Sequence, residues 1–493
     1  MERYDDKSSM ALVPATERTV SFESVAEFSL PEYLGEVGKL LWVRPTVQLP
    51  NGFLSAGTAE YAGRVTYRVL FVGTDGKLYG TEQEENYSFS LPCEAAGLEL
   101  ISVLPQVDAV ISRVMGPRKI SVRCRMHAEV MGYVEKNLAP DVKGAQGPLC
   151  HLGGVAEGGR FASLRSEMIE LGEEIALEDD AQVVFTNAEV YLPEVDARVG
   201  EARCRGEVVV TLVLSSEAGT PYALARRLPF DTVVEGEMIS SGSALRACGA
   251  VCDLRAVKGE GRLALAVSFI LSVEMQESIP VTYLKDAFLP GSQTECGTER
   301  TRIFCGGECG NVHFSVSGRV KAETCGMPRD AIVLASLAEG EVRDKRQDAR
   351  GITVSGEICC HILYKNGEEL GAAGMSVPFS VRTDGAFESL SLGASVPSCL
   401  VGRQGDELVL DAELMLALRA CNGSDLTRVR EIETMPLAKG TASDIEICYP
   451  SRGESLWDVA RRYAISPEEL AISNGIASES YDLPLGTTHL LIP

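Results

Sequence analysis

The sequence predicts a mainly β fold: three tandem antiparallel repeats resembling β-sandwiches, followed by a small domain of strand–helix–helix–strand order. Two observations predict the repeats. Three segments share a glycine followed by alternating apolar residues, and a second, longer alternating segment closes each unit. The third observation is a change of pattern after residue 443, where two short segments take the period of a helix.

The three glycines are Gly63, Gly206 and Gly356, spaced 143 and 150 positions apart. The residues two, four, six and eight positions after each are apolar, which is typical of a strand with one buried face. A phenylalanine follows 26, 24 and 23 positions after the glycine: Phe89, Phe230 and Phe379. Long alternating strands begin after 57, 57 and 52 positions, at Ile120, Leu263 and Leu408. Because this order recurs three times, we predict three homologous units, each with sheets packed face to face.

This spacing also predicts the domain boundaries. We expect an N-terminal tail at 1–20, repeats at 21–140, 141–280 and 281–435, and the small domain at 444–493. Segments 136–173 and 278–329 are expected to be connectors between units. The first contains glycine-rich turns, and its residues 164–172 are expected to form a short helix ended by Gly172.

Composition limits the function. The chain has 46 basic and 70 acidic residues, a net charge of −24, with 45% hydrophobic residues. An acidic protein is a poor partner for nucleic acid or anionic lipid, since both need a basic patch. No run approaches the ~20 apolar residues of a membrane span, so we expect no membrane insertion. The N-terminus shows no basic and apolar leader, and the fifteen cysteines are scattered, which favours reduced thiols in a cytoplasmic compartment.

The last fifty residues predict a compact domain. Strand 445–450 leads to a helix at 456–463 that Ser455 or Glu454 can cap. A second helix begins at Pro467, with Ser466 as N-cap and Glu469 completing a capping box. Residues 490–492 form a closing strand.

This segment resembles a LysM domain. Gly453-Glu454-Ser455-Leu456-Trp457, Leu470-Ala471-Ile472-Ser473-Asn474 and the ending from Gly486 to Pro493 are similar to that family's motifs. The resemblance implies a shallow groove for N-acetylglucosamine-containing glycans between the loops around Arg452–Leu456 and Asn474–Leu485. The candidate groove residues are Arg452, Gly453, Glu454, Ser455, Asn474, Tyr481 and Leu483. We expect Trp457 in the core and Tyr481 as the stacking residue.

The repeats resemble the SPOCS family of spore-forming Firmicutes, through Leu30-Pro31-Glu32-Tyr33-Leu34, the glycine–strand–Pro-Phe order and Tyr283-Leu284-Lys285-Asp286-Ala287-Phe288. The resemblance covers about residues 20–435. Together with the LysM domain it implies a spore coat assembly scaffold in the mother cell, at the forespore surface. There the LysM domain would dock onto a coat morphogenetic ATPase, among other coat proteins.

The residues predict no active site and no cofactor. The cysteine cluster Cys296, Cys305, Cys309 and Cys325 lacks the paired spacing of a zinc site, and no phosphate-binding glycine loop or nucleophile motif is present. The leading function is a non-enzymatic coat scaffold, and the second is a protein that binds peptidoglycan or chitin-like glycans through its LysM segment. A hydrolase whose site the motifs do not reveal ranks last.

Overall fold

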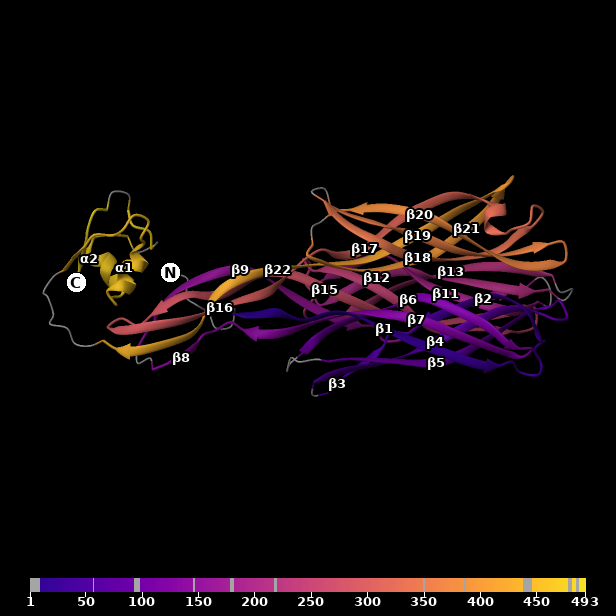
Figure 1. The fold of residues 1–493 in the computed structure, drawn as a ribbon, viewed down its shortest axis with the longest axis horizontal. Coiled ribbons are helices and arrows are strands. Elements are labelled where there is room, and N and C mark those ends of the chain that lie inside the picture. Colours follow the sequence, from indigo (N-terminus) through magenta and orange to yellow (C-terminus); the bar gives the residue numbers. More distant parts are fainter. Residues whose placement is uncertain are drawn as a thin grey trace.

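The structure, a computed structural model, is built almost entirely of antiparallel strands, with two short α-helices near the C-terminus (Figure 1). It describes residues 9–55, 57–92, 98–144, 147–177, 181–216, 220–348, 351–384, 387–437, 446–477, 481–484 and 487–493. The mainly β fold class, with two short α-helices in the C-terminal domain, is confirmed. No helix among these residues has both the length and the apolar character needed to cross a bilayer.

Each unit contains two sheets, which we name by their middle strands. The glycine sheet has the repeated glycine in its middle strand, and the closing sheet has the long closing strand in its middle. In the first unit the glycine sheet has the strand order β2 (Val37–Val47), β4 (Thr58–Gly73) and β5 (Leu78–Pro92), with β3 (Asn51–Ser55) also paired to β4. In the second unit it is β11 (Gln182–Arg198), β12 (Glu201–Ser215) and β13 (Pro221–Glu235). In the third unit it is β18 (Ile332–Asp348), β19 (Gly351–Asn366) and β20 (Glu369–Thr383).

The closing sheets repeat in the same way. In the first unit the closing sheet is β1 (Met10–Ser29), β7 (Lys119–Asn137) and β6 (Leu98–Gly116). In the second unit it is β10 (Ile169–Ala176), β15 (Arg262–Phe288) and β14 (Ala244–Lys258), with β9 (Cys150–Arg165) also paired to β15. In the third unit it is β17 (Cys309–Lys321), β22 (Glu407–Pro436) and β21 (Ser389–Gln404), with β16 (Ser292–Gly306) and β8 (Asp141–Lys143) also paired to β22. A 3-10 helix, η2 (Ala322–Cys325), follows β17. The three units therefore share one topology, and Gly63, Gly206 and Gly356 are each the sixth residue of their middle strand.

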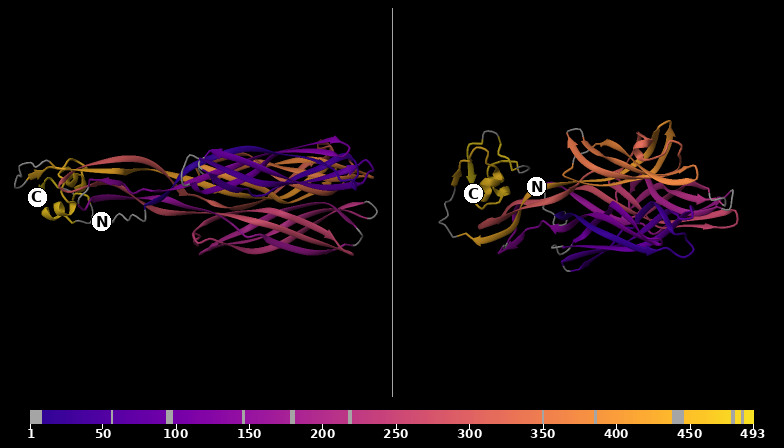
Figure 2. Two further views of the ribbon diagram at one scale, coloured as in Figure 1. Left: turned by 90° about the horizontal axis from the view of Figure 1, so that it is seen from below. Right: turned by 45° about the vertical axis from the view of Figure 1, so that its right-hand side comes forward.

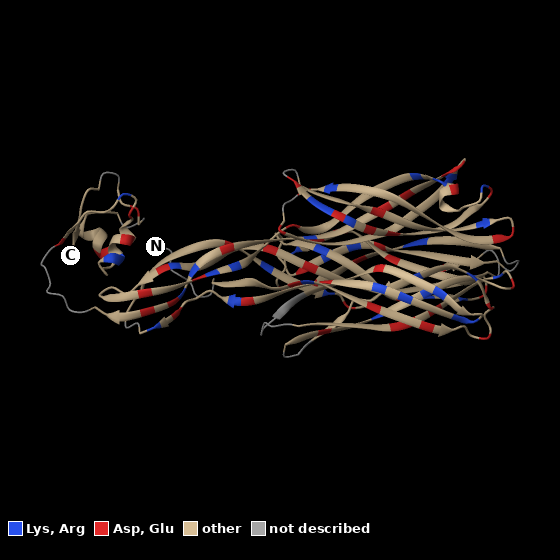
Figure 3. Ribbon diagram, in the orientation of Figure 1, with Lys and Arg blue, Asp and Glu red and all other residues tan. Residues whose placement is uncertain are grey.

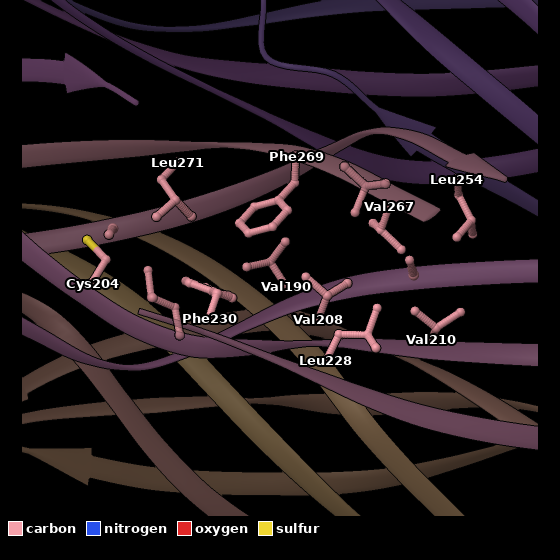
Figure 4. Packing of buried hydrophobic residues seen from close by; sticks show 14 of the residues in the cluster. Val190, Cys204, Val208, Val210, Leu228, Phe230, Leu254, Val267, Phe269 and Leu271 are labelled. Carbon is pink, nitrogen blue, oxygen red and sulfur yellow. The ribbon is translucent and has the colours of Figure 1, made fainter. Parts of the chain in front are cut away.

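The two sheets of each unit enclose a core made of the predicted alternating residues. In the second unit, Val208, Val210, Leu212 and Leu214 are fully buried against the closing strand, and Figure 4 shows Val208 and Val210 with Phe230, Phe269 and Leu271 in this core. The corresponding residues of the first and third units form equivalent cores.

The repeated glycine provides space for an aromatic ring on the neighbouring strand. Gly206 is paired with Phe230 and Gly356 with Phe379, and a Cβ on Gly356 would lie 2.8 Å from the Phe379 ring and closer still to a backbone oxygen, that of Glu341. In the first unit the aromatic residue paired with the glycine is Tyr87, and the recurring Phe89 pairs with Tyr61 instead. Tyr87 follows Gly63 by 24 positions, the same offset as Phe230 from Gly206, whereas Phe89 follows it by 26.

The three units pack around a common axis. The outer faces of their glycine sheets meet there, so the middle strands are buried on both faces. Leu70, Val213 and Leu363, each seven positions after the repeated glycine, are fully buried in this shared cluster. Each has a cross-strand partner in the same cluster: Trp42, Phe185 and Ala335. Figure 2 shows the second unit, in magenta and pink, as a separate lobe beside the other two.

A stalk of long strands extends from one end of the three units (Figure 1). It contains β9 and β16 together with the ends of β7, β15 and β22 and the start of β1, around a narrow apolar interior. Residues 10–20, expected in a tail, therefore form half of β1, and the expected connectors are stalk strands rather than loops. The boundary predicted at residue 280 falls inside β15.

The helix predicted at 164–172 is absent. Ile169–Ala176 is instead strand β10, paired along β15. The glycine-rich part of β9 is extended because its glycines leave room for large neighbours: a Cβ on Gly159 would lie 2.6 Å from the Phe304 ring, and one on Gly154 would lie 2.7 Å from the Tyr283 ring. Local glycine content indicated turns, whereas packing inside a thin stalk requires glycine in a strand.

A buried charged network joins the three units where the stalk begins. Glu274 lies 2.7 Å from Arg246 Nε and 3.0 Å from Arg419 Nη1, and the hydroxyl of Ser102 donates to it. Arg246 also donates to Ser391. Despite burial, which favours the neutral acid, the two guanidinium groups lower the pKa of Glu274 to about 2. The network contains residues from all three repeats and fixes their mutual register.

Glu274→Gln should lower the free energy of unfolding by about 3 kcal/mol at pH 7, because it leaves two buried cations without a counterion. The pKa of Glu274 is below its ordinary value of 4.5 in the folded state, so its contribution is complete above pH 4.5 and is lost as pH falls towards 2. Denaturant titrations at pH 7, 4 and 3 should show the difference from wild type shrinking with acid. The exposed Glu260→Gln is the matched control, and equal stability of both variants at pH 7 would contradict the role of the network.

Two thiols face each other inside the third unit. Cys360 Sγ and Cys399 Sγ lie 3.4 Å apart, between the two sheets. A disulfide needs about 2.05 Å, a movement that side-chain rotation can supply. We expect oxidised glutathione to take up the two thiol hydrogens and leave a Cys360–Cys399 disulfide, detected by peptide mapping and by a higher Tm. Cys399→Ser should abolish both changes, and a glutathione adduct on Cys399 without the cross-link would contradict this geometry.

Candidate functional site

The C-terminal domain has the predicted order: β23 (Glu446–Cys448), α1 (Leu456–Arg462), α2 (Pro467–Ser473) and β24 (Leu490–Ile492). Its core contains Leu456, Val459, Ala460, Leu470, Ala471, Leu490 and Ile492, all buried. Cys448 and Trp457 are buried in the same core, which also receives residues from the stalk.

Ser455 starts α1 through a full capping box. Its hydroxyl accepts from Asp458 N at 3.2 Å, and the Asp458 carboxylate accepts from Ser455 N at 2.8 Å. Hydrogen bonds that the Ser455 hydroxyl and the Ser455 backbone N–H donate to the Asp458 carboxylate lower the pKa of Asp458. The second predicted box does not form, because Ser466 is the N-cap of α2 but its side chain makes no capping hydrogen bond. Here the rigid φ of Pro467 at the first helical position starts the helix instead.

The two loops that the sequence marked as groove edges touch each other. Leu456 N donates to Tyr481 O at 2.7 Å, joining the start of α1 to the loop before β24. Arg452 and Gly453 are exposed beside this junction, and Gly453 has a φ of +84°. Glu454 is half-buried and pairs with Arg462 at 2.9 Å. The loops thus form a surface with a polar, exposed end at Arg452.

The opposite end of this surface is apolar. Tyr481 and Leu483 are half-buried and pack on the domain core. The Tyr481 ring lies edge-on to Trp457, with centroids 5.3 Å apart. Burial raises the pKa of Tyr481, which keeps the phenol neutral and its oxygen a hydrogen-bond donor.

Asn474 has a structural role in this arrangement. Its Nδ2 donates to Leu470 O and Leu491 O, both at 2.8 Å, and its Oδ1 accepts from Leu491 N at 2.6 Å. The side-chain amide therefore ties the end of α2 to β24 and has its polar atoms engaged inside the domain. Its place in the motif is explained by folding rather than by contact with a ligand.

The stalk tip packs directly against α1. Trp457 is 2% exposed, as expected for a core residue, but part of its cover comes from outside its own domain. Phe288 lies edge-on to the Trp457 ring at 5.0 Å, and Asp286 accepts from Trp457 Nε1 at 2.8 Å. Asp286 also forms an ion pair with Arg461.

Further contacts come from the same end of the stalk. Gly291 N donates to Ala464 O at 2.7 Å, and Cys150 and Leu152 from β9 pack on the domain core. Burial raises the pKa of Cys150, which keeps this thiol uncharged. Sequence reasoning missed these stalk residues as part of the site. The segment 283–288 had been singled out for the family resemblance, but its spacing gives no sign of which domain it contacts.

Metal chemistry finds no support in the described residues. The four cysteines of the predicted cluster lie apart: Cys296 contacts Ala287 O, Cys305 contacts Glu157 O, Cys309 lies near Glu274, and Cys325 is in η2. No group of three or more His, Cys, Asp or Glu side chains in the described ranges is arranged to hold an ion.

Comparison with known families identifies the C-terminal domain. Residues 451–488 match the family model described as LysM domain. This segment is a LysM domain. The match covers both loops and both helices but leaves the three β units unassigned. No curated protein matches the chain, and no solved structure matches it.

Asn474→Ala should destabilise the LysM domain by about 2–3 kcal/mol, because it removes three hydrogen bonds and leaves backbone groups of Leu491 unpaired. We expect the melting temperature of the LysM domain to fall. The near-UV signal of Trp457 monitors this transition. Asp482→Ala, an exposed change in the neighbouring loop, is the control. An unchanged melting temperature with weakened ligand binding would instead make Asn474 a ligand contact.

Proposed function

We propose that this protein is a non-enzymatic binder of N-acetylglucosamine-containing glycans, such as peptidoglycan, that acts through its LysM domain. The observation that carries the proposal is the match of residues 451–488 to that family, whose members bind such glycans. The exposed loop at Arg452 supplies a hydrogen-bond donor at one end of this surface, and Tyr481 supplies an aromatic ring at the other, two features that a sugar site uses.

The three β units serve in this proposal as a rigid scaffold that holds the LysM domain away from the body. Acidic and basic residues are interspersed along their strands (Figure 3). The length of the stalk supports a spacer function.

A second candidate is a spore coat scaffold in the mother-cell cytoplasm whose LysM domain docks onto a coat morphogenetic ATPase. The order of units resembles that of the clostridial spore coat morphogenetic protein SipL. One observation favours protein docking: α1 already packs against a protein surface of its own chain, because Trp457 and Arg461 contact Asp286 of the stalk. In this reading the coat ATPase and other coat proteins are the partners.

The two candidates differ in salt dependence. The LysM segment 444–493 carries three arginines and eight acidic residues, so a protein partner would present a basic patch and binding would weaken with salt. Binding to a neutral chito-oligosaccharide should depend little on salt.

Arg452→Ala in the full-length chain should weaken binding to chitohexaose and insoluble peptidoglycan by about 1–2 kcal/mol, since interfaces concentrate their energy in a few arginine and aromatic anchors. Isothermal titration and co-sedimentation measure this loss. Arg329→Ala, an exposed arginine of the third unit, is the matched control. Failure of wild type to bind either glycan, together with salt-sensitive binding to the coat ATPase, would transfer the conclusion to the second candidate.

A further inference from the structure

We infer that the stalk tip is an intramolecular ligand of the LysM domain, and that a glycan reaching the Tyr481 side of the site must displace it. The inference rests on the proposed function for its glycan arm, but the docking itself is independent of that function. The stalk tip here means Cys150, Leu152, Asp286, Phe288 and Gly291.

The contact has the composition of a specific docking site. One carboxylate, Asp286, serves two donors that lie one helical turn apart on α1, Trp457 and Arg461. Its side chain is only 16% exposed, so the two donors replace most of its water. Beside it, Phe288 is 1% exposed and lies edge-on to the Trp457 ring. A buried aromatic anchor next to a paired charge is the usual centre of an interface.

The docked surface and the glycan surface share residues. Trp457 contacts Phe288 on one side and Tyr481 on the other. Tyr481 and Leu483 belong to the same apolar cluster as Cys150 and Leu152 of β9. Tyr481 is therefore half-buried, while Arg452 at the other end of the surface is exposed. The stalk tip covers the aromatic end of the site and leaves the polar end accessible.

One polar contact of the docked stalk tip lies partly in solvent. Arg461 is 36% exposed, so its pair with Asp286 is partly screened by solvent. Docking then reduces the apparent glycan affinity by the fraction of molecules in which the site is open. Weakening the stalk tip should raise that affinity without changing any residue of the LysM domain.

The test uses the full-length chain in a Trp42→Phe background, which leaves Trp457 as the single tryptophan. Asp286→Ala and Phe288→Ala are the opening variants. Asp286 lies outside the apolar core of the LysM domain, so its removal leaves that core intact. Tyr33→Ala, an exposed aromatic residue of the first unit, is the matched control.

The first readout is acrylamide quenching of Trp457 fluorescence. We expect the Stern–Volmer constant to rise several-fold in both opening variants and to stay at the wild-type value in Tyr33→Ala. Circular dichroism and the melting temperature verify that the variants are folded. Trp457 equally protected in folded Asp286→Ala and in wild type would overturn the inference.

The second readout is affinity for chitohexaose and for insoluble peptidoglycan. We expect both opening variants to bind several-fold more tightly than wild type, and Tyr33→Ala to bind as wild type does. Equal affinities would overturn the competition between stalk and glycan. No glycan binding by any variant, with quenching raised as expected, would overturn the proposed function while leaving the docking established.

Discussion

The buried carboxylate of Glu274 holds the three units in one arrangement, together with the apolar cluster on their common axis. Glu274 neutralises arginines from the second and third units and accepts a hydrogen bond from Ser102 of the first. Two of the participants, Glu274 and Arg419, each lie twelve positions after the first residue of their closing strand, and the equivalent residue of the first unit is Met131. Their cross-strand partners, Arg246, Ser391 and Ser102, complete the set. The network therefore centres on one position of the repeat, which is apolar in the first unit, acidic in the second and basic in the third.

The repeat pattern was readable in the sequence because it follows from backbone geometry. A strand with one buried face alternates, and the glycine recurs since an aromatic ring on the next strand occupies the space of its side chain. The residues seven positions after each glycine were not recognised as buried. Leu70, Val213 and Leu363 face away from their own core, and only the packing of three units around one axis removes them from water.

The same limit applies to the stalk and the LysM domain. Segments rich in glycine were expected to be connectors, because local composition cannot show that Tyr283 or Phe304 will lie across them. The LysM motifs located the loops of the domain and the cap of α1 correctly. Sequence alone could not place Asp286 and Phe288, more than 160 positions earlier, against Trp457, since such a contact is decided by where the stalk ends.

The length of β22 has a mechanical consequence. This strand runs for 30 residues from the core of the third unit to the stalk tip, and the LysM domain follows it in the chain. A pull on a glycan held by that domain would load β22 along its own axis, so the hydrogen bonds to β16, β17 and β21 would resist together rather than one after another. The three-residue pairing of β23 with β24 offers far less resistance. Under tension the LysM domain would therefore unfold before β22 detaches from its neighbours. The three-lobed body would stay folded, and the LysM domain could bind again after refolding.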